Sequence, residues 1–587
     1  MNPLDRTLRA LPFLLPLLLP SLTSRPLAAQ GEADLVAPTG VEAMSWDRFR
    51  DYKGIVELMQ AMQKRWPDYV SLTPIGKSVQ GRTLWVMTVN DPKTGKDTTK
   101  PAMYVDANIH GNEVQGAEAA LYMAWYVLRF APRVPRLRKI LAERVFYIVP
   151  SVNPDGRDYW FHKANTASSS RGGQAPVDSD GDGLFDEDPP NDLDKDGNIT
   201  MMRKKVPLGE GSFRIDPDDP RIMVRVGPGE KGDYNILGSE GIDDDGDGRI
   251  NEDGPGGYDP NRDWGSDWQP RWIQWGARPL PFSLPESRAV RDFLLAHPNV
   301  AGVQAYHNAG GMILRGPGSK YVNYAAGDKR AYDIFGRKGE ELIPFYRYLV
   351  IWDDLYTVHG GFVDWTYMGL GVLSFTNELW ARTQLDQGRK DLDRTATTKL
   401  SGDLSFDAYI VPWQPYNHPL YGKIEIGGTV KNSGRIPPSF LIQEMLHRNS
   451  AFVLYQSEEL PEIKLASSKI TPAGADLFYV DLVLENPRVT PTRTAQAIQR
   501  KIGQPDLLLV TQAGPKILQA SRFRDAFRKN EGTPLPSALQ PTRIPIPEGI
   551  PSRGKLRIRY LVQGKGTLHL RYQAQKAKDL DLQIPIR

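Results

Sequence analysis

The sequence predicts an α/β domain with a mixed, mostly parallel central sheet and helices on both faces, followed by a small all-β sandwich. Three observations support this prediction. Short apolar runs rich in Val, Ile, Phe and Tyr recur along the first part of the chain, and they are too continuous to be half-exposed strands. Amphipathic helical patterns lie between these runs. Past Leu460, residues alternate between apolar and polar, which is typical of strands with one buried face.

The first 29 residues have the features of a cleaved secretory signal. Arg6 and Arg9 precede the apolar run LPFLLPLLLP, and the small residues Ala28 and Ala29 follow it. A membrane anchor is the alternative, but this run has ten residues, whereas a spanning helix needs about 20. No later segment reaches that length, so we expect a secreted or periplasmic protein without a membrane span.

The predicted α/β domain covers residues 43–455. Its first element is a helix that ends at Pro67 and has one apolar face, formed by Ile55, Leu58, Met59, Met62 and Trp66. The predicted buried strands then lie at 83–89, 102–110, 144–153, 300–308 and 372–380. Helical patterns at 113–130 and 285–297 separate them. This alternation favours helices on both faces of one sheet.

An acidic segment at about 166–258 interrupts the alternation with Asp, Gly and Pro. Between Asp178 and Asp253 there are 22 acidic and 9 basic residues. We interpret this segment as an insertion outside the core, and its charge requires cations or a partner.

The C-terminal segment, residues 460–587, is predicted to be the all-β sandwich. Around QGKG, apolar residues alternate with polar ones, which predicts a β-hairpin formed by Leu556, Ile558 and Tyr560 with Leu568, Leu570 and Tyr572. From Pro461 onward there are 21 basic and 10 acidic residues. A polyanion could bind there, but no nucleic-acid motif accompanies the charge, so we favour a solvated surface and no nucleic-acid partner. The partner of this domain stays unknown.

The absence of cysteine excludes disulfides, thiolate nucleophiles and thiolate zinc sites. Any transition metal must therefore bind to nitrogen and oxygen. With eight histidines in the chain, the candidate ligands are few.

Four histidine and glutamate side chains lie at or near the ends of predicted strands. His110 and Glu113 follow one strand, His307 ends a second and Glu378 lies in a third. Because open α/β sheets bind ligands at the carboxyl ends of their strands, we expect these side chains to meet. Two imidazoles and one carboxylate can hold zinc and leave a position for water, and Glu378 can then act as the general base. For the His110–Glu113 pair alone, a helix cap or a core histidine is the alternative.

Seven motifs, in this order, resemble the zinc carboxypeptidases of the carboxypeptidase A type, the M14 metallopeptidases. The motifs are HGNE, VNPDGR, MMRKK, YDPNRDW, YHN, YTVHGGFVDWTY and SFTNELW, and they span about residues 45–430. The resemblance implies the zinc carboxypeptidase fold, zinc on His110, Glu113 and His307, and Glu378 as the base.

The same resemblance implies four further roles. Arg203 would stabilise the oxyanion, and Asn261 and Arg262 would bind the terminal carboxylate of the substrate. Tyr356 would close over the substrate. Val363 would form the base of the specificity pocket, where an aliphatic residue favours an apolar or aromatic C-terminal residue.

Three Asp-rich loops in the insertion predict calcium sites. Two follow the pattern DxDxDGxxxED and the third is a variant of it, and alternate aspartates in a Gly-bearing loop direct hard oxygens to one point. A solvated acidic loop is the alternative. The expected ligands are Asp178, Asp180, Asp182, Asp186 and Glu187, then Asp192, Asp194 and Asp196, then Asp243, Asp245, Asp247 and Glu252.

The sequence therefore predicts a secreted zinc metallocarboxypeptidase whose substrates are the C-termini of peptides or proteins. A cell-wall peptide or amide hydrolase of the same fold is one alternative. A catalytically degenerate, calcium-stabilised binding protein is another, which is disfavoured because every expected catalytic position is filled.

Overall fold

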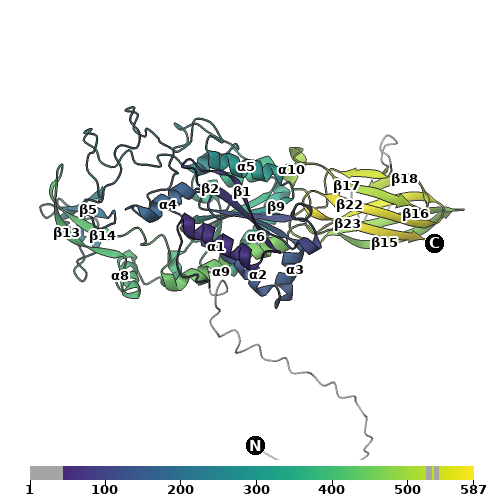
Figure 1. Cartoon of the computed structure of the whole chain (residues 1–587), viewed down its shortest axis with the longest axis horizontal. Coiled ribbons are helices and arrows are strands. Elements are labelled where there is room, and N and C mark those ends of the chain that lie inside the picture. Colours follow the sequence, from purple (N-terminus) through teal and green to yellow (C-terminus); the bar gives the residue numbers. More distant parts are fainter. Residues whose placement is uncertain (1–43, 524–531, 535–540) are drawn as a thin grey trace, which may run out of the picture. The chain divides into compact units, whose positions relative to one another are not determined.

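An eight-stranded mixed sheet forms the centre of the α/β domain (Figure 1). The computed structural model describes residues 44–523, 532–534 and 541–587, so the predicted signal at 1–29 lies outside the described residues. The strand order is β1-β2-β4-β3-β9-β12-β10-β11. The bounds are β1 Val70–Lys77, β2 Thr83–Val89, β3 Ala102–Ala107, β4 Val145–Val149, β9 Val300–Asn308, β10 Met312–Arg315, β11 Arg347–Val350 and β12 Leu373–Leu379.

The strands in the middle of this sheet run parallel. β4, β3, β9 and β12 pair in parallel, whereas the pairs β1–β2, β2–β4 and β12–β10 are antiparallel. Every residue of β3, β4 and β9 is buried, as expected for strands covered on both faces. The predicted fold class is therefore confirmed.

Helices cover both faces of the sheet. The predicted first helix is α1, which Asp51 caps by accepting a hydrogen bond from the Gly54 N–H, and its buried residues are those of the predicted apolar face except half-buried Trp66. The bounds are α1 Tyr52–Arg65, α2 Gln115–Phe130, α3 Pro135–Glu143, α4 Pro154–His162, α5 Pro285–Ala296, α6 Ala326–Leu342, α7 Phe362–Leu370, α8 Arg394–Ser405, α9 Ser439–Glu458 and α10 Ala495–Gln499. None of the helices in the described part of the chain combines the length and apolar character that a membrane crossing requires.

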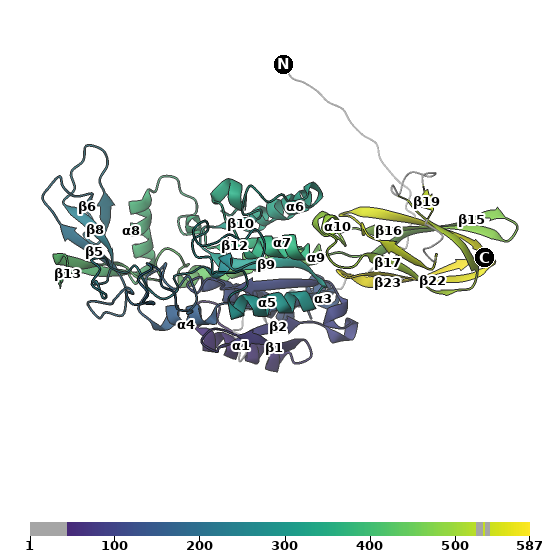
Figure 2. The ribbon, with the colours of Figure 1, turned by 90° about the horizontal axis from the view of Figure 1, so that it is seen from above.

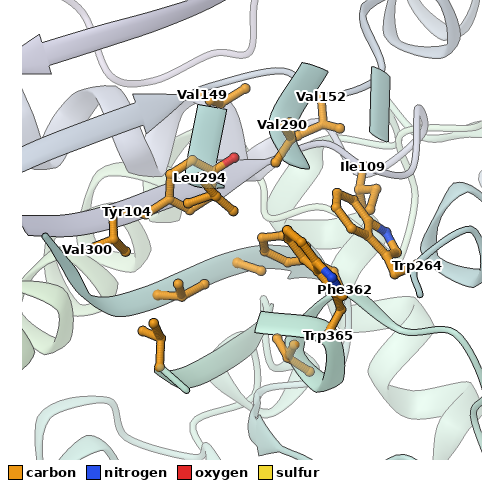
Figure 3. Close-up of a cluster of buried hydrophobic side chains, with 14 of the residues drawn as sticks. Tyr104, Ile109, Val149, Val152, Trp264, Val290, Leu294, Val300, Phe362 and Trp365 are labelled. Carbon is orange, nitrogen blue, oxygen red and sulfur yellow. The ribbon is translucent and has the colours of Figure 1, made fainter. Parts of the chain in front are cut away.

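One face of the sheet packs against α5 and α7 through a cluster of large apolar side chains (Figure 3). Trp264 lies with its ring centre 4.6 Å from that of Phe362 and 5.2 Å from that of Trp365. Val290 and Leu294 of α5 belong to the same cluster. Because this cluster fixes the start of α7, it also fixes the wall of the pocket described below.

The insertion is more regular than the sequence predicts. Four of its segments form strands, β5 Met201–Lys205, β6 Phe213–Ile215, β7 Met223–Arg225 and β8 Tyr234–Ser239. They join β13 Ile410–His418 and β14 Gly422–Thr429 in a six-stranded sheet of order β13-β14-β5-β8-β6-β7, part of which Figure 2 shows. The acidic loops lie outside these strands.

The C-terminal domain consists of two antiparallel sheets that enclose one apolar core. The first contains β15 Lys464–Gly474, β16 Leu477–Asn486, β21 Gly554–Gln563, β18 Lys516–Phe523 and β19 Gly532–Pro534. The second contains β20 Arg543–Ile546, β17 Asp506–Ala513, β22 Gly566–Ala574 and β23 Ala577–Ile586.

The predicted β-hairpin around QGKG is wrong. β21 pairs with β16 and β18, whereas β22 pairs with β17 and β23, so the two strands belong to different sheets. Their apolar side chains instead share the core of the sandwich. The alternation correctly identifies the buried face of each strand but not its partner strand, because either arrangement buries the same face.

Candidate metal centre and substrate pocket

Three adjacent strands bring four of the predicted residues to one edge of the central sheet. His110 follows the end of β3, and Glu113 lies two residues before the start of α2. His307 lies in β9, and Glu378 lies in β12 directly beside it in the register of the sheet. The structure therefore confirms the prediction that these strand ends converge.

The ligand-type atoms of His110, Glu113 and His307 point toward one another. Nδ1 of His110 lies 3.0 Å from Oε1 of Glu113, and Nδ1 of His307 lies 2.9 Å from Oε2. The two Nδ1 atoms are 3.1 Å apart. All three side chains are buried. Two imidazole nitrogens facing one another beside a carboxylate form a donor set that a cation satisfies, and nitrogen with carboxylate oxygen is a set that zinc takes.

Asp259 holds His110 in the orientation that such a site needs. Its Oδ1 lies 2.9 Å from Nε2 of His110. With the proton on Nε2 and shared with Asp259, Nδ1 keeps its lone pair for a metal, and a carboxylate behind a histidine ligand is the usual arrangement in zinc sites. Burial favours the neutral carboxyl, but Arg262, His110 and Arg171 outweigh it and hold the pKa of Asp259 well below its usual range.

Glu378 has the properties of a general base. Within the described part of the chain its carboxylate makes no hydrogen bond or ion pair like those of Glu113, and it lines the pocket. Burial, together with the neighbouring Glu113, raises the pKa of Glu378 to about 7, although His307, Arg171 and Arg435 oppose the shift. A carboxylate with a pKa near neutrality can both take up and release a proton at physiological pH.

The four side chains open into a pocket of about 240 Å³. Asn261, Arg262, Tyr356 and Val363 line it as well. The pocket therefore contains eight of the nine residues predicted for zinc binding, catalysis and substrate binding, since His110, Glu113, His307 and Glu378 are also among its lining residues.

Neighbouring groups hold the guanidinium of Arg262 in place, but they do not use all of its hydrogen-bond donors. It is buried, and it donates from one terminal nitrogen to the Asn261 carbonyl at 2.7 Å while the other lies 3.4 Å from Asp259. Its Nε has no hydrogen-bond partner. Asn261 in turn accepts a hydrogen bond from the Phe362 N–H, which ties this residue to the start of α7. A buried guanidinium with an unused donor suits a carboxylate ligand.

Part of the pocket wall is apolar. Val363 lies in the first turn of α7, and Met312, Leu314, Ile351 and Val358 complete this wall. Tyr356 is exposed and follows the short helix η5 at Ile351–Leu355. Its place at the rim allows the side chain to reach over a ligand.

Arg203 does not lie in this pocket, and its predicted position is corrected. It belongs to β5 of the six-stranded sheet, where its Nε donates to Glu425 at 2.6 Å. Its guanidinium also packs on the rings of Trp413 and Tyr234, 4.2 Å and 4.8 Å from their centres. Through these contacts the side chain takes part in the packing of that sheet.

Two arginines that the sequence reasoning missed line the pocket instead. Arg171 donates to Glu113 at 3.2 Å and to Asp259 at 3.1 Å. Arg435 donates to the Asn308 carbonyl at 2.6 Å and lies 3.6 Å from Glu113. Both stand in irregular segments without periodicity, SSSRGG and NSGRIPP. In the sequence, these two arginines are marked only by being charged residues among small ones, and this is a weak indication of a functional role.

The predicted calcium ligands lie in three loops, of which the two outer ones meet. Asp180, Asp182 and Glu187 of the first loop come together with Asp245 of the last loop, so loops far apart in the sequence meet. The middle loop folds on itself: Asp192 accepts from the N–H groups of Asp196 and Gly197. Asp186 accepts a hydrogen bond from the Val177 N–H at 3.4 Å instead of turning to its neighbours. The remaining predicted ligands are Asp178, Asp194, Asp196, Asp243, Asp247 and Glu252, which lie in the same three loops.

The chain matches two family models. One, described as zinc carboxypeptidase, matches residues 55–191 and 235–401, which is more than half of the chain. The gap between these ranges contains β5, β6 and β7 of the second sheet. The other, described only as a domain of unknown function, matches residues 462–585.

Individual relatives are more distant. Carboxypeptidase D of Anas platyrhynchos is 29% identical over 133 residues, 21% of this chain and 10% of that protein. The catalytic chain of carboxypeptidase N of Rattus norvegicus is 32% identical over 110 residues, 19% of this chain and 24% of that one. The matched part thus spans less than a quarter of each relative. Among solved structures, carboxypeptidase A of Helicoverpa armigera is 17% identical, with a TM-score of 0.42 over 72% of this chain and 77% of that chain.

Proposed function

The chain belongs to the zinc carboxypeptidase family, and on this basis we propose that it is a secreted zinc metallocarboxypeptidase that hydrolyses the C-terminal peptide bond of peptides. The observation that carries the proposal is the convergence of His110, Glu113 and His307 beside Glu378 in a pocket that also contains Arg262. The proposed zinc ligands, the proposed base and the residue proposed to bind the substrate carboxylate thus line one cavity.

Zinc would be held by Nδ1 of His110, the Glu113 carboxylate and Nδ1 of His307. When bound, zinc polarises the scissile carbonyl and makes the attacking water more acidic. Residues of the chain orient the proposed ligands. Asp259 keeps the His110 ring in place, and the Asn308 N–H donates to Glu113 Oε2 at 3.2 Å, which orients that carboxylate.

Glu378 would take the proton from the attacking water. Its position next to His307 in the sheet places the carboxylate beside the metal ligands and not among them. The same group can then deliver the proton to the nitrogen of the departing amino acid, because its pKa of about 7 allows both transfers.

Arg262 would bind the terminal carboxylate of the substrate, with Asn261 beside it and Tyr356 closing over the ligand. The free Nε of Arg262 and a terminal nitrogen can form the two parallel hydrogen bonds that a carboxylate accepts. This contact selects the end of a chain and holds the scissile bond at a fixed distance from Glu378.

Arg171 replaces Arg203 in our proposal for the oxyanion. It lines the pocket and holds positive charge next to Glu113 and Asp259. A fixed donor at the developing oxyanion contributes roughly 3 to 4 kcal/mol to catalysis. The side chain remains one-third exposed, so it can approach a substrate carbonyl.

An apolar or aromatic C-terminal residue fits the pocket best. Val363 and its apolar neighbours offer no charge, and the one acid in this wall, Asp364, is already engaged. It accepts hydrogen bonds from the Tyr324 hydroxyl at 2.7 Å and the Gly318 N–H at 2.8 Å, and burial raises its pKa to about 6. A basic substrate side chain would therefore find no free counter-charge.

Secretion and calcium belong to the same proposal. The signal-like pattern of residues 1–29 is the feature that supports an extracellular or periplasmic location. Loops of alternate aspartates supply the hard oxygen ligands that calcium requires.

Hydrolysis of N-blocked dipeptides tests the proposed function. The substrates should end in Phe, Leu or Arg, and each should be compared with its C-terminal amide. We expect turnover of the free acids with Phe or Leu preferred, and a loss of at least about tenfold for Arg and for the amides. Equal cleavage of acids and amides, or no cleavage by protein that contains zinc, would contradict the proposal.

A further inference from the structure

The two outer acidic loops are copies of one structure. In the first acidic loop, residues 178–188, Asp178 accepts hydrogen bonds from the N–H groups of Gly181 at 2.6 Å and Gly183 at 3.1 Å. In the second acidic loop, residues 243–253, Asp243 accepts from Gly246 at 2.6 Å and Gly248 at 3.0 Å. The two backbones therefore turn in the same way at equivalent positions.

Each loop ends in an aspartate that crosses over to the other loop. Asp188 and Asp253 are both fully buried, and they face each other in an antiparallel bridge. Asp253 Oδ2 accepts from the Ser179 N–H of the first loop at 3.0 Å, and Asp188 Oδ1 accepts from the Asp244 N–H of the second at 3.3 Å. Each loop thus donates a backbone hydrogen bond to the last aspartate of the other loop.

The carboxylates form groups that combine both loops. Asp178 and Asp180 of the first loop group with Asp253 of the second, and Asp245 and Glu252 of the second group with Asp188 of the first. Within each group the ligand-type oxygens lie within 4.8 Å of one another. At such distances the repulsion between carboxylates needs a positive charge to offset it.

Several carboxylate oxygens of the two loops are buried and have no hydrogen-bond partner among the described residues. Oδ1 of fully buried Asp253 accepts no hydrogen bond, and neither do the two solvent-shielded oxygens of Glu187 or of Glu252. A buried carboxylate oxygen without a donor is costly, so these oxygens point to a ligand that their own loops do not supply.

We propose that the two outer acidic loops form a pair of calcium sites with exchanged ligands, in which Asp253 completes the site of the first loop and Asp188 that of the second. Oxygen ligands from both loops provide the number of hard donors that calcium takes. Because each site needs both loops, calcium binding fastens residues 178–188 to residues 243–253.

Two chain segments connect this calcium pair to the zinc pocket. Residues 171–179 and residues 253–259 run side by side between the two sites. The Ala175 N–H donates to the Tyr258 hydroxyl at 3.3 Å, and a side chain at Gly172 would collide with the backbone of Gly256 at 2.4 Å. At the pocket end, Arg171 bonds to Asp259.

Calcium therefore supports the residues that hold the zinc ligand His110. This second part of the inference rests on the proposed function: the paired segments keep Arg171 and Asp259 in place only while the calcium sites hold their far ends together. Loss of calcium is expected to lower kcat/KM, with zinc still bound.

Calcium titration of the zinc-loaded full chain tests the sites. We expect two calcium ions per chain by calorimetry at concentrations up to about 10 mM, with a rise in Tm. Asp253→Asn and Asp188→Asn should each weaken calcium binding at least about tenfold. Asp218→Asn, an exposed carboxylate of the insertion that pairs with Lys399, is the matched control and should bind calcium as the wild type does. No binding by the wild type, or equal binding by all four proteins, would overturn the proposal.

The activity assay separates this inference from the proposed function. The kcat/KM for a blocked dipeptide is measured with and without calcium at constant zinc content, and we expect a loss of at least about threefold without calcium. An unchanged kcat/KM would overturn the link to the zinc pocket. The calcium titration itself needs no turnover: calcium binding by a wild-type, zinc-loaded chain that hydrolyses no blocked dipeptide supports the sites while the proposed function fails.

Discussion

At the residue scale, the chemistry of the site depends on which nitrogen of His110 is free. Asp259 accepts a hydrogen bond from the Nε2–H and leaves Nδ1 for a metal, and Arg171 and Arg262 keep Asp259 ionised. We therefore expect the zinc affinity to depend on Asp259, a residue outside the proposed ligand set.

Replacing Asp259 with Asn should weaken zinc binding by about 10- to 100-fold. The amide can still accept a hydrogen bond, but it lacks the charge that fixes the tautomer and pairs with the two arginines. Competition with a chelator of known affinity measures the effect, and Asp218→Asn serves as the control. Zinc affinity within a factor of two of the wild type in Asp259→Asn would show that Asp259 does not orient His110.

Arg171→Ala and Arg203→Ala should behave differently. Arg171 lines the pocket, so its loss should lower kcat about 10²- to 10³-fold. Arg203 packs between Trp413 and Tyr234 in another sheet, so its loss should lower Tm and leave the kcat of the folded enzyme within about threefold. If Arg203→Ala lowers kcat more than Arg171→Ala does, the oxyanion role belongs to Arg203 instead.

The pH profile should have an acidic limb set by Glu378. The base acts only when it is deprotonated, and burial with Glu113 raises its pKa to about 7, so activity should fall as the pH drops through that value. A dication on the neighbouring ligands would move this limb to lower pH. Measurement of kcat/KM from pH 5 to 9 checks the prediction, and an acidic limb that is unchanged in the residual activity of Glu378→Gln would exclude Glu378 as the titrating base.

The sequence predicts the ligands and the base but not the residues that support them. His110, Glu113, His307 and Glu378 follow or end apolar strands, and the topology of an α/β sheet brings such positions together. Asp259 and Arg171 lie in irregular segments, and their role arises from contacts between stretches 88 residues apart in the sequence. No periodicity marks such contacts, which is why resemblance alone selected Arg203.

At the element scale, alternation identifies the buried face of a strand but not its neighbour. The strands before and after QGKG were expected to pair, yet each joins a different sheet, and their apolar faces meet in the core. The strands of the insertion were missed for a similar reason: β5 pairs with β14, more than 200 residues away, and short strands between Asp-rich loops carry little pattern of their own.

Engineered cysteine pairs test the arrangement of β21, since the chain has no other cysteine. Glu485→Cys with Lys555→Cys joins partners in the register of β16 and β21 and should form a disulfide under mild oxidation. Lys555→Cys with Ala574→Cys joins the positions that a hairpin would pair and should stay reduced, because stacked sheets lie about 10 Å apart. A disulfide in the second pair only would restore the hairpin.

At the scale of the whole molecule, the chain combines a family domain with additions of its own. The family match covers the eight-stranded sheet, and it is interrupted at residues 192–234, which contain the middle acidic loop and the strands β5, β6 and β7. The segment that carries Arg435 and the sandwich both lie outside that match. We therefore expect substrate selection to depend in part on residues outside the family match.

The most direct test of the central claim measures zinc content and activity together in two variants. Glu378→Gln should bind one zinc per chain and lose about 10²- to 10⁴-fold in kcat on a blocked dipeptide, because only the base is removed. His307→Ala should lose both zinc and activity, because a ligand is removed. Full activity in Glu378→Gln, or wild-type zinc binding in His307→Ala, would contradict the account.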